Sequence, residues 1–171
     1  MPRRQIRRMN ETMRLLCSAQ KTISLAVLRQ ALRLVAKRFG DVTMADLVAP
    51  QTSQSTGLYF FWHPDHDEVV YVGRARSRAI IERVPSHLDV RAEGWFGTLL
   101  QRIQEEKGLS DRSAAVPHAL ALRLSILVAD YDNIDMSNAE TELRHAYRPT
   151  LNRPKTIRHV NCARATLEAI S

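Results

Sequence analysis

Hydrophobic positions along the chain are concentrated in short segments that polar residues separate. Two of these segments, residues 57–62 and 68–73, are rich in aromatic and β-branched residues, and the five residues between them have the composition of a loop. This pattern predicts a β-hairpin. A third apolar run, over residues 121–129, is also compatible with a strand, so we expect three strands.

The first part of the chain is predicted to be largely helical. Residues 5–20 and 24–39 predict two helices, and the second has an apolar face and a separate basic face. The apolar face consists of Leu25, Leu28, Leu32 and Val35, and the basic face of Arg29, Arg33 and Lys37. Further along, Thr43 to Asp46 is a capping-box sequence that predicts a short helix, which Pro50 ends.

A polar, turn-rich segment over residues 51–56 predicts a linker between two parts of the chain. We therefore expect a basic helical N-terminal extension over residues 1–52 and a second domain over residues 53–171. The second domain is predicted to be α+β, with a small three-stranded antiparallel sheet flanked by helices. Its expected helices cover residues 77–90, 95–107 and 137–147.

The composition is that of an ordinary folded protein. The chain has 171 residues, of which 44% are apolar and 25% charged. No apolar run approaches the ~20 residues that a membrane span needs, and the basic start lacks the apolar core of a secretory signal. Its arginines leave an organellar transit peptide as an alternative. Cys17 and Cys162 are far apart and suggest neither a disulfide nor a zinc site. We therefore expect a cytoplasmic protein without a membrane partner.

The surplus of positive charge is confined to the N-terminal quarter of the chain. The net charge is +7, but residues 1–40 contain 10 Lys and Arg against one acidic residue, whereas the remainder contains 15 bases and 17 acids. This distribution is typical of a segment that contacts nucleic acid, and a solvated helix face is the alternative. The candidate contacts to DNA phosphates in this segment are Arg3, Arg4, Arg7 and Arg8.

Residues able to carry phosphodiester chemistry occur in a fixed order between positions 57 and 152. The set consists of the tripeptides Gly57-Leu58-Tyr59 and Tyr71-Val72-Gly73, the pair Arg83 and His87, and Glu140 followed by Pro149 and Asn152. In this order and spacing the residues resemble the motif of the GIY-YIG nuclease family. Members of that family hydrolyse phosphodiester bonds with a tyrosine, an arginine and one metal-binding glutamate.

The resemblance implies a role for each residue of the first half of the set. Tyr59 and Tyr71 would face the active site from adjacent strands, and Tyr59 would orient or deprotonate the attacking water. Arg83 would stabilise the charge that develops on the phosphate, with His87 assisting nearby. A phenol with an ordinary pKa of about 10 is a poor base, so a cation is needed close to it.

Glu140 and Asn152 complete the site that the resemblance implies. Glu140 would be the sole protein ligand of a divalent cation, Mg²⁺ or Mn²⁺, which also binds water and the scissile phosphate. Ser137 to Glu140 is itself a capping-box sequence, so securing the start of a helix is an alternative role for this glutamate. Asn152 would tie the chain after that helix back towards the tyrosines.

The helix expected over residues 77–90 contains an interruption. Tyr71 and Arg83 are twelve positions apart, two more than in the commonest form of the family motif, and Pro85 lies between Arg83 and His87. The helix therefore either ends near Arg83 or restarts with Pro85 in its first turn.

Three more arginines follow the second tripeptide, at alternating positions. Arg74, Arg76 and Arg78 are candidate contacts to DNA phosphates. Arg76 or Arg78 is also an alternative for the catalytic arginine. The four-residue spacing to His87 favours Arg83 instead.

Taken together, these features predict a metal-dependent endonuclease acting on DNA, with double-stranded DNA as the expected partner. The lack of a recognisable second DNA-binding domain favours a restriction or defence nuclease. The alternatives are a homing, mobile-element or repair nuclease of the same family, or a catalytically impaired DNA-binding protein on the same scaffold. Whether two subunits pair as a homodimer to cut both strands stays open.

Overall fold

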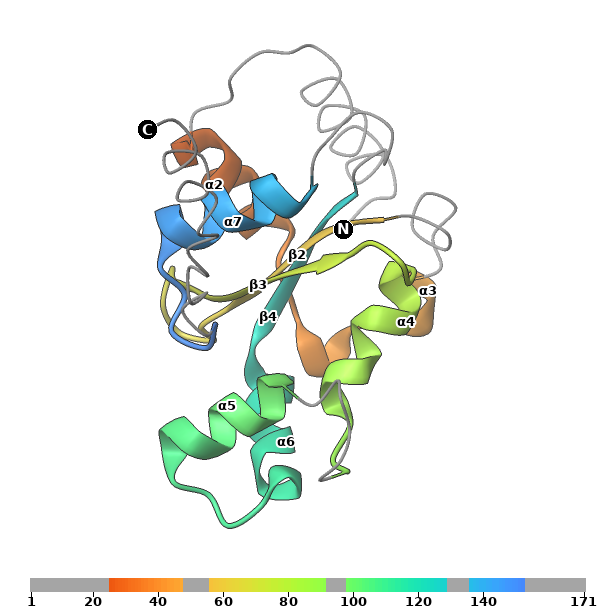
Figure 1. Ribbon diagram of the computed structural model, residues 1–171, viewed down its shortest axis with the longest axis vertical. Coiled ribbons are helices and arrows are strands. Elements are labelled where there is room, and N and C mark those ends of the chain that lie inside the picture. The colour runs from red at the N-terminus through yellow and green to blue at the C-terminus, as the bar shows by residue number, and fades with distance from the viewer. Residues whose placement is uncertain (1–24, 48–55, 92–97, 129–135, 153–171) are drawn as a thin grey trace, which may run out of the picture.

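The computed structural model of the protein describes residues 25–47, 56–91, 98–128 and 136–152, which form helices around one antiparallel sheet (Figure 1). The four strands are hydrogen-bonded in the order β1-β4-β2-β3. They are β1 (Lys37–Arg38), β2 (Gly57–Trp62), β3 (Val69–Ala75) and β4 (Arg123–Val128). The α+β class and the flanking helices are confirmed. The prediction of three strands is wrong, because the sheet has a fourth.

The additional strand lies where the sequence predicts the end of a helix. Helix α2 (Leu25–Val35) ends before the expected residue 39. Lys37 and Arg38 then pair with β4, and the Phe39 N–H donates a hydrogen bond to the Leu122 carbonyl at 2.7 Å. Phe39 is buried in the core, so pairing with a distant strand outweighs the local helical preference.

Strands β2 and β3 form the predicted hairpin, and a β-bulge between them sets which side chains share a face. Phe61 pairs with Tyr71 but Trp62 pairs with Val69, so Val70 is the additional residue on β3. Between the bulge and the open end of the hairpin, side chains alternate regularly. Both motif tyrosines consequently lie on the same face of the sheet.

Helices cover both faces of the sheet. On one face, α2 and α7 (Met136–Tyr147) pack on a cluster that includes Phe60, Trp62 and Val72. The opposite face carries the larger core, around the two tyrosines. Its covering elements are α3 (Met44–Leu47), α4 (Ile80–Arg83), the 3₁₀ turn η2 (Pro85–Leu88), α5 (Thr98–Lys107) and α6 (Arg112–Ala121).

The capping box predicted before α3 is confirmed. The Thr43 N–H donates to Asp46 Oδ2 at 2.7 Å, and the Asp46 N–H donates to Thr43 Oγ1 at 3.2 Å. Lys37 Nζ donates to the same carboxylate at 2.7 Å. The ion pair thus links β1 to α3.

The basic face of α2 contacts the tip of the hairpin. Arg33 Nε lies 2.7 Å from Asp67 Oδ1, and Arg29 donates to the Asp67 main-chain carbonyl. Leu32, on the apolar face of the same helix, is fully buried against the sheet. The described part of the predicted extension therefore packs on the sheet. The predicted boundary between residues 52 and 53 lies outside the described residues.

Helix α6 is an element that the sequence pattern does not predict. Asp111 caps it by accepting a hydrogen bond from the Ala114 N–H at 3.0 Å. Pro117 lies inside the helix, where proline is normally disfavoured because it cannot donate a helical hydrogen bond. Over the described ranges, no helix combines the length and apolar character required to cross a membrane.

Candidate active site

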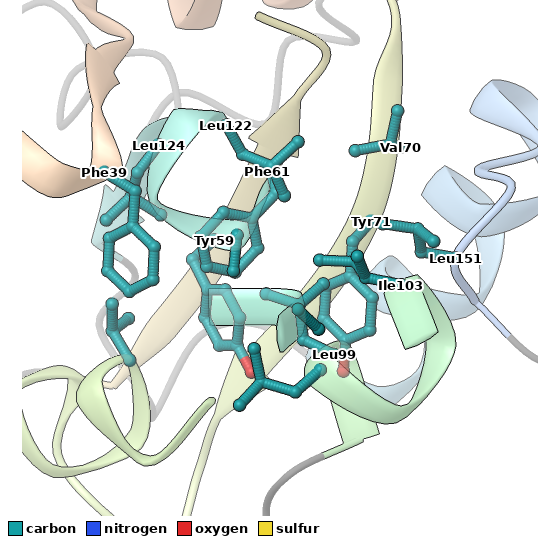
Figure 2. Packing of buried hydrophobic residues seen from close by; sticks show 14 of the residues in the cluster. Phe39, Tyr59, Phe61, Val70, Tyr71, Leu99, Ile103, Leu122, Leu124 and Leu151 are labelled. Atoms are coloured by element: carbon teal, nitrogen blue, oxygen red, sulfur yellow. The ribbon is translucent and has the colours of Figure 1, made fainter. Parts of the chain in front are cut away.

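The two motif tyrosines lie next to each other at the centre of the larger core. Their rings stack with centroids 6.3 Å apart and an interplanar angle of 21°. Figure 2 shows both hydroxyl oxygens pointing to the same side of the sheet. Tyr59 is fully buried and Tyr71 is 7% exposed. The strand register therefore presents two neighbouring phenols to one site.

Gly73 makes room for the Tyr59 ring. The two residues pair directly across β2 and β3. A Cβ atom on Gly73 would lie 2.2 Å from Tyr59 Cζ and 2.4 Å from its hydroxyl oxygen, a separation that no side chain tolerates. Gly73 is thus required for the position of the Tyr59 ring, because only glycine leaves this space.

His87 is the direct hydrogen-bond partner of Tyr59. Its Nε2 lies 2.7 Å from the Tyr59 hydroxyl, and its ring packs edge-on against Tyr59, Phe61 and Tyr71. Burial, and secondarily the charge of Arg83, lower the pKa of His87 from 6.5 to about 3. The imidazole is therefore neutral at pH 7 and can accept the Tyr59 proton in its hydrogen bond. Its Nδ1 has no hydrogen-bond partner among the described residues.

Arg83 reaches the tyrosines although the helix is interrupted after it. Helix α4 ends at Arg83, and Pro85 occupies the first turn of η2, which confirms the predicted restart. The Arg83 charge acts on Tyr59, Tyr71 and His87, and its side chain hydrogen-bonds Tyr59. The altered spacing therefore does not keep Arg83 from the predicted site.

The two phenols differ from free tyrosine in their acidity. Burial raises the pKa of Tyr59 well above its usual value, and the neighbouring Tyr71 adds to the increase. Burial also raises the pKa of Tyr71. Arg83 acts in the opposite direction on both, and the negative charge of Glu140 raises both further. Both hydroxyls consequently stay protonated near neutral pH.

Glu140 lies between two arginines. Its Oε2 is 3.2 Å from Arg74 Nε, and its Oε1 is 3.6 Å from Arg144 Nη1. The Glu140 side chain is 11% exposed, that of Arg74 is 32% exposed and that of Arg144 is 16% exposed. Arg144 also acts electrostatically on Tyr71. The carboxylate is thus part of a polar cluster between α7 and β3 whose charges act on the tyrosines, which a helix-capping role alone does not explain.

Asn152 attaches the chain after α7 to the outer edge of β3. Its Oδ1 accepts from the Val72 N–H at 2.7 Å, and its Nδ2 donates to the Val72 carbonyl at 2.9 Å. The Leu151 N–H donates to the Val70 carbonyl at 2.9 Å. Because Val72 separates Tyr71 from Gly73, the prediction that Asn152 ties the chain back towards the tyrosines is confirmed.

The remaining candidate residues are other arginines. Arg76 and Arg78 are exposed on the segment that follows β3, so they are accessible at the surface but are distinct from the arginine that contacts Tyr59. The candidate DNA contacts Arg3, Arg4, Arg7 and Arg8 lie outside the described residues. Sequence reasoning missed Arg144. Its spacing from Glu140, i to i+4 on a helix, was the available signal.

Comparisons with known proteins do not assign the chain: no protein-family model, no curated protein and no solved structure matches it.

Proposed function

We propose that this protein is a metal-dependent endonuclease that hydrolyses DNA phosphodiester bonds with a site of the GIY-YIG type. The observation that carries the proposal is the convergence of residues that lie far apart in the chain. Tyr59 contacts both His87 and Arg83, and the charge of Glu140, from the last described helix, acts on the same hydroxyl. Six residues placed in order by the sequence motif thus belong to one connected region.

The electrostatics of the region suit a phosphodiester. Among the described residues, the guanidinium groups of Arg74, Arg83 and Arg144 accompany the carboxylate of Glu140, so the positive groups of this set outnumber the negative one. Such a surplus attracts an anionic phosphate and stabilises the additional charge of its transition state. Burial keeps Tyr59 and Tyr71 protonated, so we propose that they orient the attacking water rather than remove its proton on their own.

The donor set at Glu140 fits a magnesium or manganese ion. A single carboxylate in a partly exposed polar cluster suits a hard cation that keeps most of its waters. No three His, Cys, Asp or Glu side chains gather as a ligand set in the part of the chain that the structure describes. When bound, the ion would supply charge neutralisation at the phosphate.

A DNA-binding protein without catalytic activity is the second candidate. Two observations favour it: Tyr59 is fully buried, and both Glu140 oxygens already face guanidinium groups. The positive surplus would serve phosphate binding in either case. For an active enzyme, we propose a role as a restriction or other defence nuclease on double-stranded DNA.

Plasmid cleavage tests the proposal. Supercoiled plasmid would be incubated with the protein and Mg²⁺ or Mn²⁺, comparing wild type with Glu140→Gln and with Glu142→Gln. Glu142 is an exposed residue of the same helix, so its variant is a matched control for the loss of one charge. We expect cleavage by wild type and Glu142→Gln, and a loss of about 100-fold or more in Glu140→Gln. Intact plasmid with both metals, together with retained DNA binding in a gel-shift assay, would support the second candidate.

A further inference from the structure

The arrangement around Glu140 suggests how cation and DNA binding depend on each other, an inference that rests on the proposed function. Arg74 comes from β3 and Arg144 from the next turn of α7, so two elements direct positive charge at one carboxylate. Each guanidinium faces a different carboxylate oxygen. A divalent cation that binds Glu140 must compete with both arginines for these oxygens, and their charges repel it.

A phosphate group would relieve this competition. Guanidinium groups bind the oxygens of carboxylates and phosphates in the same forked geometry, so an incoming phosphodiester can accept the hydrogen bonds that Glu140 receives. Arg74 is prepared for such a ligand, because its Nη1 is buried and has no hydrogen-bond partner among the described residues. Arg144 also acts electrostatically on Tyr71, so this second guanidinium lies within range of the tyrosine site.

We propose that Arg74 and Arg144 form a phosphate-binding pair that neutralises Glu140 until DNA is bound. DNA phosphate draws the two guanidinium groups away from the carboxylate, and Glu140 then binds the cation more tightly. By linkage, the cation strengthens DNA binding by the same factor. Arg144 is thereby assigned as a DNA-binding residue of the site.

Manganese binding to the full chain tests this assignment without relying on cleavage. Free Mn²⁺ would be followed by electron paramagnetic resonance during titrations with and without a phosphorothioate DNA duplex. Glu140→Gln serves as the blank for ions bound elsewhere on protein or DNA. Arg144→Gln is compared with Arg148→Gln, which removes the same charge from an exposed residue just after α7.

Without DNA, we expect Arg144→Gln to bind Mn²⁺ about threefold or more tightly than wild type, and Arg148→Gln to match wild type. Duplex DNA should tighten Mn²⁺ binding to wild type by about fivefold or more, and to Arg144→Gln by less. Arg144→Lys keeps the charge and should retain wild-type affinity in the free protein, which guards against an effect of altered folding. Arg144→Gln should also reduce the slope of log K against log salt for DNA binding by about 0.9, the value expected for the loss of one phosphate contact.

Two results would overturn the assignment. One is Mn²⁺ binding to Arg144→Gln that is no tighter than to Arg148→Gln, and the other is a wild-type affinity for Mn²⁺ that DNA does not change. Failure of the proposed function is a different result. Plasmid cleavage without this coupling would reject only the arginine pair, whereas coupling without plasmid cleavage would reject only the nuclease activity.

Discussion

At the scale of single residues, space as well as hydrogen bonding positions Tyr59. Its ring occupies the volume that a side chain on Gly73 would need, and its hydroxyl contacts His87 at 2.7 Å. Asn152 forms hydrogen bonds with both the N–H and the carbonyl of Val72, the β3 residue next to Gly73. Three motif residues that differ in chemistry therefore act on the position of one phenol.

Gly73→Ala tests the steric part of this arrangement. The added methyl group would overlap the Tyr59 ring, which is fully buried and cannot move into solvent. We expect a loss of about 1 to 3 kcal/mol in the free energy of unfolding, measured with urea, and a loss of plasmid cleavage. Gly40→Ala is a milder comparison, because its Cβ would meet the Leu120 carbonyl oxygen at 3.3 Å, a tight contact rather than an overlap. Wild-type stability of Gly73→Ala would contradict the assigned role of Gly73.

His87 predicts a dependence of stability on pH. Its pKa is about 3 in the folded protein and 6.5 in the unfolded chain, so between these values only the unfolded chain takes up the proton. The contribution is fully present above pH 6.5 and is lost as the pH falls towards 3. Between pH 6.5 and 5, His87 alone should lower the free energy of unfolding by about 2 kcal/mol. Urea unfolding of wild type and His87→Gln over this pH range measures this change in the free energy of unfolding. If the free energy of unfolding depended on pH equally in both proteins, the prediction would be contradicted.

At the scale of helices and strands, local patterns predict the elements that local chemistry determines. The hairpin follows from two aromatic and β-branched runs, and the bounds of α7 lie within one residue of the expected 137–147. Strand β1 is not predictable in this way, since its two residues form a strand only by pairing with β4. Pro117 and a run of alanines conceal α6, although the cap at Asp111 was a usable signal.

The candidate site also combines residues that the local sequence predicts with one that only tertiary packing brings in. The motif supplied its tyrosines, Arg83, His87, Glu140 and Asn152. The tyrosines and Glu140 lie on elements that the pattern places correctly, whereas Arg83 and His87 lie on two short elements within the helix expected over residues 77–90. Arg144 was missed because its contact with Glu140 matters only once α7 is packed near β3. The helical spacing shows that the two side chains can meet, but tertiary packing decides that they do so beside Arg74 of β3.

Two prolines in short helical elements should have opposite effects when replaced by alanine. Pro85 occupies the first turn of η2, where its missing N–H is not required, so Pro85→Ala should lose about 0.5 to 1 kcal/mol through a freer unfolded chain. Pro117 lies within α6, where it removes a helical hydrogen bond, so Pro117→Ala should gain about 1 to 3 kcal/mol. Urea unfolding measures both changes. A gain for Pro85→Ala would mean that the break between Arg83 and His87 is strained.

At the scale of the whole molecule, the N-terminal region combines two kinds of positive charge. Arg29 and Arg33 of α2 contact Asp67 within the fold, and Leu32 of the same helix is fully buried. Residues 1–24 contain six further bases and one acidic residue, by count of the sequence. The described fold begins at Leu25, so a deletion can separate the two groups of charges.

Removal of residues 1–24 should weaken DNA binding and flatten its salt dependence. Each lost phosphate contact lowers the slope of log K against log salt by about 0.9. Removal of residues 1–40 should in addition destabilise the protein, because it deletes α2, β1 and the buried Leu32 and Phe39. Fluorescence anisotropy with a DNA duplex at several salt concentrations, together with urea unfolding, distinguishes the two. An unchanged salt slope in the shorter deletion would assign these bases to solubility instead of DNA contact.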